Sequence, residues 1–220
     1  MATHVNQGLM DSDFKAGPSR FGWSMRDSDV SAFKGTVRAV TLPSGFRLFK
    51  LSKGKAEEDA KYGVTPWWSP VMPYREDREG AIGRYNQAKL NKIDMSSMVR
   101  YMSAVCVDWN DLDNYIEVHV RPGVEISAFW GLFEQQDRFS NKIKGLFSDR
   151  GLVDNSKLSQ PSMLSRMAGY KSASMPDQLG VMDAYQFYIP GLHDEHIIRN
   201  SVLNAHDMIT LAMHFRTTWW

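Results

Sequence analysis

Two segments far apart in the chain each carry one polar side chain among large apolar ones, and those residue types suit an anionic ligand. The first, Gly45–Lys50, contains Arg47, and the second, Tyr185–Pro190, contains Gln186. A planar guanidinium meets two phosphate oxygens at once, and an amide oxygen accepts a hydrogen bond from a ligand hydroxyl. We therefore expect Arg47 and Gln186 to line one pocket for an anionic ligand.

The late segment has the alternation of a β-strand. On a period of two, Gln186 and Tyr188 share one face, while Phe187 and Ile189 share the other. Pro190 has no N–H to donate, so the strand is expected to end there. Such a strand buries one apolar face and presents Gln186 and Tyr188 on the other.

These segments resemble the ADP-ribosyltransferase-like toxin and effector enzymes. Members of that family carry an arginine or a histidine on an early strand, aromatic and serine residues in the middle, and a late strand of the form Glu-hydrophobic-hydrophobic-Ile-Pro. The early strand would be residues 46–51 here, and Gln186 stands where the family has its catalytic glutamate. The chain departs from the pattern at Gln186, and again at Ala184, where arginine-modifying members have a second acid.

The resemblance implies a fold and an activity. The fold would be α+β, with a mixed or antiparallel split β-sheet and flanking helices. The activity would be cleavage of the nicotinamide–ribose bond of NAD, with transfer of ADP-ribose to a macromolecular acceptor or to water. Arg47 would anchor the dinucleotide phosphates. Family context also implies a bacterial toxin or secreted effector that acts in a target-cell cytoplasm and is neutralised by an immunity or inhibitor protein.

A pair of tryptophans lies between the two segments, in Pro66-Trp67-Trp68-Ser69-Pro70. Neighbouring side chains diverge on an extended backbone, so one indole is expected to pack inward while the other borders a cleft. An indole face can stack on a flat cationic ring such as nicotinamide. We therefore group Trp67, Trp68 and Ser69 with Tyr188 as NAD-binding candidates. A packed structural corner is the alternative.

Gln186 decides whether such a site could be catalytic. Glutamine can accept the hydrogen bond that glutamate takes from a ribose hydroxyl, but it supplies no negative charge and no base. Three alternatives stay open: Gln186 suffices, another acid supplies the charge, or the site is inactive. Among the acids Glu134, Glu125 and Asp183, Glu134 is the strongest candidate because it follows a predicted strand.

A second cluster, His193-Asp194-Glu195-His196, could in principle bind a metal, but its spacing matches no zinc motif. We interpret it as the start of a helix, with its two acids at the positive end of the dipole. No metal site is therefore predicted.

Composition excludes several classes. The 220 residues have a net charge of +1, which argues against a broad basic surface for nucleic acid. The single cysteine, Cys106, rules out an internal disulfide and a thiolate-rich zinc site. No apolar run is long enough to span a membrane. The first residues lack a signal-peptide pattern, so we expect synthesis in a cytoplasm and any export without a cleaved signal.

The chain divides into an irregular N-terminal arm, residues 1–35, and a single α+β domain, residues 36–220. Residues 36–42 and the Arg47 segment are predicted as a β-hairpin, and strands are predicted over 115–121 and 124–131. Helices are expected to about residue 91, through 95–103, around 160–168, and over 195–216. A non-catalytic binding component of a larger assembly, which would dock through exposed aromatic residues, is the alternative to an NAD-consuming enzyme.

Overall fold

The computed structural model describes residues 5–9, 11–17, 25–52, 66–71, 86, 90, 114–137, 147–148, 151–152, 178–179 and 185–204. Eight strands of these ranges form one sheet, in the order β1-β2-β6-β11-β4-β3-β5-β12. Their bounds are β1 Lys15–Ala16, β2 Phe33–Leu42, β3 Arg47–Ser52, β4 Trp67–Pro70, β5 Asn114–Val120, β6 Ile126–Phe133, β11 Tyr185–Tyr188 and β12 Ile197–Asn204.

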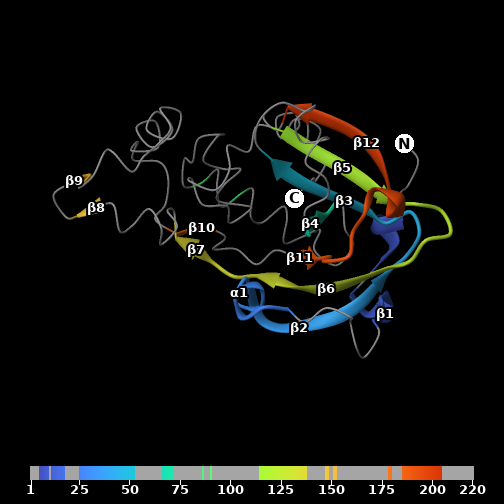
Figure 1. The fold of residues 1–220 in the computed structure, drawn as a ribbon, viewed down its shortest axis with the longest axis horizontal. Helices are drawn as coiled ribbons and strands as arrows, with labels where there is room; N and C mark the ends of the chain where they lie inside the picture. The colour runs from blue at the N-terminus through green and yellow to red at the C-terminus, as the bar shows by residue number, and fades with distance from the viewer. Residues whose placement is uncertain are drawn as a thin grey trace.

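Every strand pair in this sheet is antiparallel. The sheet curves, with β2 and β6 along one side, β3, β5 and β12 along the other, and β11 and β4 between them (Figure 1). Two further two-stranded ladders pair β7 Gln136–Asp137 with β10 Gln178–Leu179, and β8 Phe147–Ser148 with β9 Gly151–Leu152.

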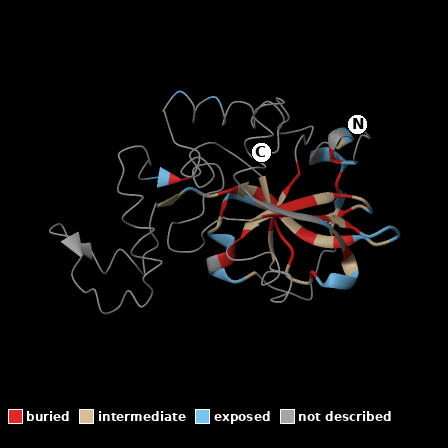
Figure 2. Ribbon diagram, turned by 90° about the horizontal axis from the view of Figure 1, so that it is seen from above, coloured by how far each residue is buried: buried red, intermediate tan, exposed pale blue. Residues whose placement is uncertain are grey.

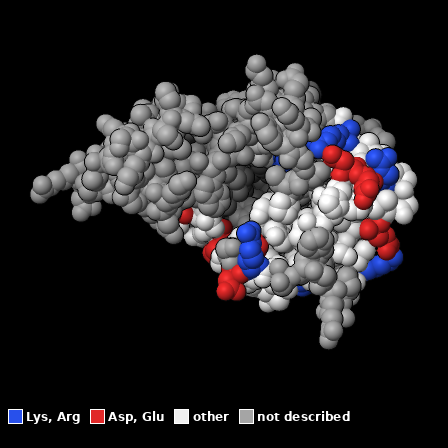
Figure 3. All heavy atoms as spheres, viewed as in Figure 1, with Lys and Arg blue, Asp and Glu red and all other residues white. Residues whose placement is uncertain are grey.

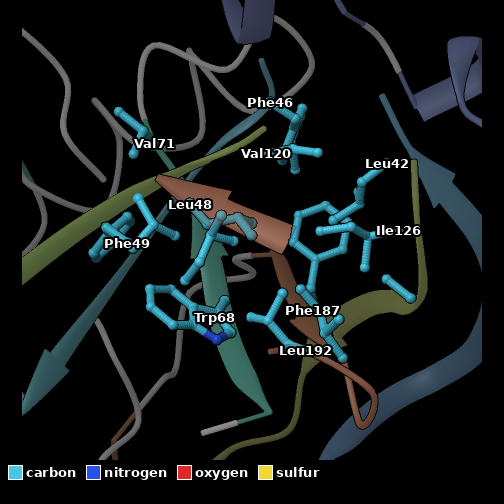
Figure 4. Packing of buried hydrophobic residues seen from close by; sticks show 14 of the residues in the cluster. Leu42, Phe46, Leu48, Phe49, Trp68, Val71, Val120, Ile126, Phe187 and Leu192 are labelled. Atoms are coloured by element: carbon cyan, nitrogen blue, oxygen red, sulfur yellow. The ribbon is translucent and has the colours of Figure 1, made fainter. Parts of the chain in front are cut away.

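Most of the core fills the concave side of the curved sheet. Figure 4 shows side chains from both sides of the sheet pointing toward one another, among them Leu42, Leu48 and Phe187. Buried residues are accordingly concentrated along the strands (Figure 2). The convex face carries the alternate residues of each strand, and there Phe49, Tyr115 and Glu117 are also buried, whereas Arg47, Trp67 and Ser69 are half-buried.

Phe14, from the predicted N-terminal arm, lies in this core. Its ring centroid is 5.6 Å from those of Phe46 and Trp130 and 5.9 Å from that of Phe187. The next residues form β1, which pairs with β2. The predicted boundary between residues 35 and 36 falls inside β2.

The predicted α+β class with flanking helices is wrong for the described residues, which are mostly antiparallel sheet. Their helical elements are the single turn α1 Asp27–Val30 and the short 3-10 turns η1 Val5–Gly8, η2 Asp11–Asp13 and η4 Asp194–His196. Positions 86 and 90 have helical backbone, and the rest of the helix predicted to about residue 91 lies outside the described residues. The helices predicted through 95–103 and around 160–168 lie outside the described residues.

The helix predicted over 195–216 is wrong where the structure describes it, because residues 197–204 form β12. Ile198 and Val202 fit a helical spacing, but β-branched residues also favour strands. β12 pairs with β5 from Ile197 to Asn204, with a register shift between Arg199 and Ser201. Tertiary pairing thus overrides the apparent helical period.

The predicted hairpin between residues 36–42 and the Arg47 strand is also wrong. Both segments are strands, as predicted, but β2 pairs with β1 and β6, whereas β3 pairs with β4 and β5. Gly45 adopts a positive φ of 78° in the connection, and its N–H donates to the carbonyl of Val120 at 2.9 Å. The turn therefore carries the chain from one side of the sheet to the other. The strands predicted over 115–121, 124–131 and from residue 185 are confirmed as β5, β6 and β11.

Candidate functional site

Strand register places four of the predicted site residues on the convex face. Tyr188 on β11 pairs directly with Trp67 on β4. Because alternate residues share a face, Gln186 lies beside Tyr188, and Ser69 lies beside Trp67. The indole of Trp67 and the ring of Tyr188 are in contact, with centroids 4.7 Å apart.

Arg47 lies on the same face, on the next strand. Phe49 on β3 pairs with Ser69 on β4, and Arg47 shares the face of Phe49. β4 lies between β3 and β11, so about 10 Å of sheet separates the strand of Arg47 from that of Gln186. The two side chains thus share a surface without touching.

Trp68 lies on the opposite, concave face. It is 2% exposed and belongs to the core cluster. The Nζ of Lys50 lies 5.5 Å from its ring centroid. Of the two adjacent tryptophans, only Trp67, which is half-buried, is placed to border a ligand on the convex face.

The amide of Gln186 is held by the turn that precedes β2. Its Nε2 donates to the carbonyl oxygen of Ala32 at 2.7 Å. The backbone N–H of Glu134 donates to the same oxygen at 2.9 Å. The Glu134 carboxylate accepts a hydrogen bond from the N–H of Gln135 at 3.0 Å. The side chain of Gln186 and the backbone of Glu134 therefore both donate to the Ala32 carbonyl. The Oε1 of Gln186 remains to accept a hydrogen bond from a ligand.

The hydroxyl of Tyr188 is held by α1. It donates to Asp29 Oδ2 at 3.2 Å, and Arg26 Nε donates to the same oxygen at 2.9 Å. The hydrogen bond from Arg26 is the main reason why the pKa of Asp29 is lowered. Burial, followed by the charge of Asp29, raises the pKa of Tyr188. Tyr188 is therefore a neutral hydrogen-bond donor fixed against α1.

Arg47 forms a buried ion pair with Glu117, a residue that the sequence analysis did not single out. Its Nε donates to Glu117 Oε1 at 2.7 Å, and its Nη2 donates to the same oxygen. The other carboxylate oxygen accepts from the hydroxyl of Tyr115 at 3.1 Å. The side chain of Glu117 is 3% exposed, and that of Arg47 is 28% exposed.

Glu117 had one signal in the sequence: it is the single acid in β5, where most of the other residues are apolar or aromatic. A buried carboxylate requires partners, and Glu117 has them in Arg47, Tyr115 and Asn200, whose Nδ2 donates to Oε1 at 2.8 Å. Burial and this carboxylate raise the pKa of Tyr115 well above its ordinary value. The structure therefore adds a carboxylate to the predicted face, but one that is already saturated.

The remaining predicted acids and histidines lie elsewhere. Glu125 is exposed and pairs with Lys15 at 2.6 Å. Asp183 and Ala184 lie outside the described residues. The rings of His193 and His196 are 5.5 Å apart, in a 3-10 turn that leads into β12. The described residues contain no group of three potential metal ligands.

Two broader surface properties agree with the sequence. In the described part of the chain, no helix has the length and apolar character needed to cross a membrane. Lysine and arginine side chains lie close to aspartate and glutamate side chains on the described surface seen in Figure 3. That mixture agrees with the net charge of +1.

Comparison of the chain with protein-family models, with curated proteins and with solved structures gives no match. The function proposed below therefore rests on the side chains of the convex face.

Proposed function

We propose that the protein binds NAD along the convex face of its sheet and cleaves the nicotinamide–ribose bond. The observation that carries the proposal is the strand register, which aligns Arg47, Trp67, Ser69 and Gln186 on one face. These are the residue types that a dinucleotide requires: a cation for phosphate, an aromatic face for nicotinamide and hydrogen-bonding groups for ribose. The fold differs from the predicted one, but an activity depends on its site and not on a fold class.

One nitrogen of the Arg47 guanidinium remains to bind the phosphates. Its Nε and Nη2 are directed at Glu117, while Nη1 has no hydrogen-bond partner among the described residues. The ion pair already orients the guanidinium, so less side-chain conformational entropy is lost when a ligand binds. In this arrangement Nη1 donates to a phosphate oxygen of the dinucleotide.

Trp67 and Ser69 would contact the nicotinamide end. The Trp67 ring contacts those of Phe33, at 5.6 Å, and Tyr188, at 4.7 Å, and these contacts hold its orientation. The hydroxyl of Ser69 makes no hydrogen bond to another residue in the part of the chain that the structure describes. It can therefore donate to the nicotinamide amide or to a ribose oxygen.

Gln186 would hold the ribose during cleavage. The bond from the nicotinamide nitrogen to C1′ breaks, the electron pair leaves with nicotinamide, and positive charge develops on the sugar. Gln186 Nε2 donates to Ala32, so its Oε1 is oriented to accept from a ribose hydroxyl. Water or an acceptor nucleophile then bonds to C1′ and loses its proton to solvent. An amide stabilises this charge less than a carboxylate does, so slow turnover is expected.

A non-catalytic binding component is the second candidate. The observation that favours it is that Gln186 and Tyr188 both already have partners in the N-terminal segment, Ala32 and Asp29. A residue committed to internal contacts can be structural. Such a component would be tolerated when expressed in a bacterium, whereas an NAD-consuming enzyme would arrest growth.

Nicotinamide release from NAD, measured with and without a bacterial lysate, tests the first candidate. Release in buffer would identify a glycohydrolase, and lysate-dependent release with label transfer would identify a transferase. Arg47→Lys is the informative variant because it retains a charge beside Glu117 but loses the fork that binds two partners. It should reduce release strongly, while Lys15→Ala, at an exposed ion pair, should not. No release under either condition would favour the binding component.

A further inference from the structure

Four polar side chains form a hydrogen-bonded chain across β3, β5 and β12. Arg47 donates to Glu117, and Asn200 Nδ2 donates to Glu117 Oε1 at 2.8 Å. Asn200 Oδ1 lies 2.5 Å from Nδ1 of His119. His119 is the direct register partner of Arg47, so the two ends of the chain lie side by side on the convex face.

The direction of each hydrogen bond follows from Glu117. A carboxylate only accepts, so the NH₂ group of the Asn200 amide faces Glu117 and its oxygen faces His119. The imidazole must then carry a proton on Nδ1 to donate to that oxygen. His119 Nε2 is therefore the ring nitrogen that remains for a ligand, and it has no partner among the residues that the structure describes.

A β-bulge brings Asn200 into this series of hydrogen-bonded side chains. On β12, Ile198 pairs with His119 and Ser201 pairs with Glu117, so a step of three residues lies opposite a step of two. Asn200 is a residue of this longer step, which locally breaks the strict alternation of side chains. Bulges redirect single side chains and occur next to functional sites. Here the bulge brings the exposed Asn200 amide into contact with both Glu117 and His119.

We propose that His119 is a second phosphate-binding residue beside Arg47, and that Asn200 and Glu117 are the positioning residues that orient it. The ligand group is a diphosphate, which offers non-bridging oxygens on two neighbouring phosphorus atoms. This inference rests on the proposed function, since the diphosphate is that of NAD. In its imidazolium form, His119 donates from Nε2–H to one phosphate while Arg47 Nη1 donates to the other.

The surroundings of His119 allow this role. His119 has Arg47 as its register partner on β3, Glu117 two residues before it, and Arg121 two residues after it, whose guanidinium donates to the carbonyls of Glu195 and Ile197. β12 contributes the neutral Ile198 and Asn200. The charges of Arg47 and Glu117 offset each other, so a protonated His119 would add most of the attraction for a phosphate.

Calorimetric titration with ADP-ribose and with adenosine tests the proposal. The two probes differ by the diphosphate and the second ribose. His119→Ala should weaken ADP-ribose binding about tenfold or more, as expected for one charge-assisted hydrogen bond, and should leave adenosine binding unchanged. Asn200→Ala should weaken ADP-ribose binding by a smaller factor. His119→Gln, whose amide donates from a similar position, should retain part of the affinity. The matched control is His193→Ala, because His193 is exposed and takes no part in the hydrogen bonds that join Arg47, Glu117, Asn200 and His119.

The outcomes separate this inference from the proposed function. Wild-type affinity for ADP-ribose in His119→Ala would overturn the role of His119 and leave NAD cleavage standing. Nicotinamide release without any ADP-ribose binding would do the same. Binding that depends on His119 without nicotinamide release would support the diphosphate site and overturn the proposed catalysis. Binding of neither ADP-ribose nor NAD would overturn both.

Discussion

The side-chain amide of Asn6 hydrogen-bonds both backbone polar groups of Arg47. Its Oδ1 accepts from the N–H of Arg47 at 2.8 Å, and its Nδ2 donates to the carbonyl of Arg47 at 2.8 Å and to that of Val71 at 3.1 Å. Asn6 is fully buried. A residue near the start of the chain thus satisfies the first residue of β3, where the guanidinium of the proposed site is attached.

Asn6→Ala should therefore destabilise the protein by about 2–4 kcal/mol, because it leaves the Arg47 N–H without its partner in a buried position. Urea unfolding would measure the loss. Gly8→Ala, where an added Cβ meets nothing within 4 Å, is the control and should be near neutral. Equal stabilities of the two variants would contradict this account of Asn6.

The two adjacent tryptophans should respond differently to truncation. Trp68→Ala empties part of the core and should cost about 3–5 kcal/mol. Trp67→Ala removes a half-buried ring from the convex face and should cost less, about 1–2 kcal/mol, yet reduce nicotinamide release at least about tenfold. Unfolding and turnover should be measured on both variants. If Trp67→Ala released nicotinamide at the wild-type rate, Trp67 would not belong to the site.

Gln186→Glu should have opposite effects on stability and on turnover. The new carboxylate cannot donate to Ala32, so the hydrogen bond at 2.7 Å is lost, at a cost of about 1–3 kcal/mol. The added negative charge should raise nicotinamide release about tenfold or more by stabilising the charged sugar. Gln186→Ala, which loses the hydrogen bond without gaining the charge, should reduce release. A parallel decrease in both variants would remove Gln186 from the catalytic step.

Asp29 should make part of the stability depend on pH in the acid range. Its pKa in the folded protein is lowered, chiefly by the hydrogen bond from Arg26. The contribution is therefore present above the unfolded value, about 4, and is lost as the pH falls through the folded pKa. Asp29→Asn should flatten the fall of the melting temperature below about pH 4. A slope in Asp29→Asn equal to that of the wild type would contradict this account of Asp29.

Gly131→Ala should overcrowd the packing next to Gln186. Gly131 is the register partner of Gln186, and an added Cβ would lie 2.9 Å from Phe33 Cδ1 and 3.3 Å from the carbonyl oxygen of Thr36. Relief requires Phe33 to move, at a cost of about 1–3 kcal/mol. Because Phe33 contacts Trp67, the intrinsic fluorescence should change along with the unfolding midpoint. An unchanged midpoint would show that Phe33 shifts freely.

The sequence allowed β2, β3, β5, β6 and β11 to be predicted as strands, since a strand follows from local alternation. The shared face of Gln186, Tyr188 and Trp67 is consistent with the period of two along β11 and β4. The strand order was not predictable, because it depends on long-range pairing: the residues before and after Gly45 look like a hairpin but join different neighbours. The apolar spacing of β12 fits both a helix and a strand, so the sequence alone does not distinguish them.

The polar network around Glu117 was also beyond the sequence. Nothing local links Arg47 to Glu117, or His119 to Asn200, since each pair meets only through the register of β3, β5 and β12. The bulge that admits Asn200 has no glycine or proline to mark it. A single acid in an apolar strand does, however, predict that a buried cation or a set of donors will be found opposite it.

The strand order described above also has a consequence for how fast the protein reaches its native state. Of the seven neighbouring pairs in the order β1-β2-β6-β11-β4-β3-β5-β12, only β1 with β2 and β3 with β4 join strands consecutive in the chain. The others close long loops before their contacts can form. Folding dominated by such distant pairings is slow and leaves strand edges open to other molecules meanwhile. Dilute refolding at low temperature should therefore give a higher yield of folded protein than concentrated refolding.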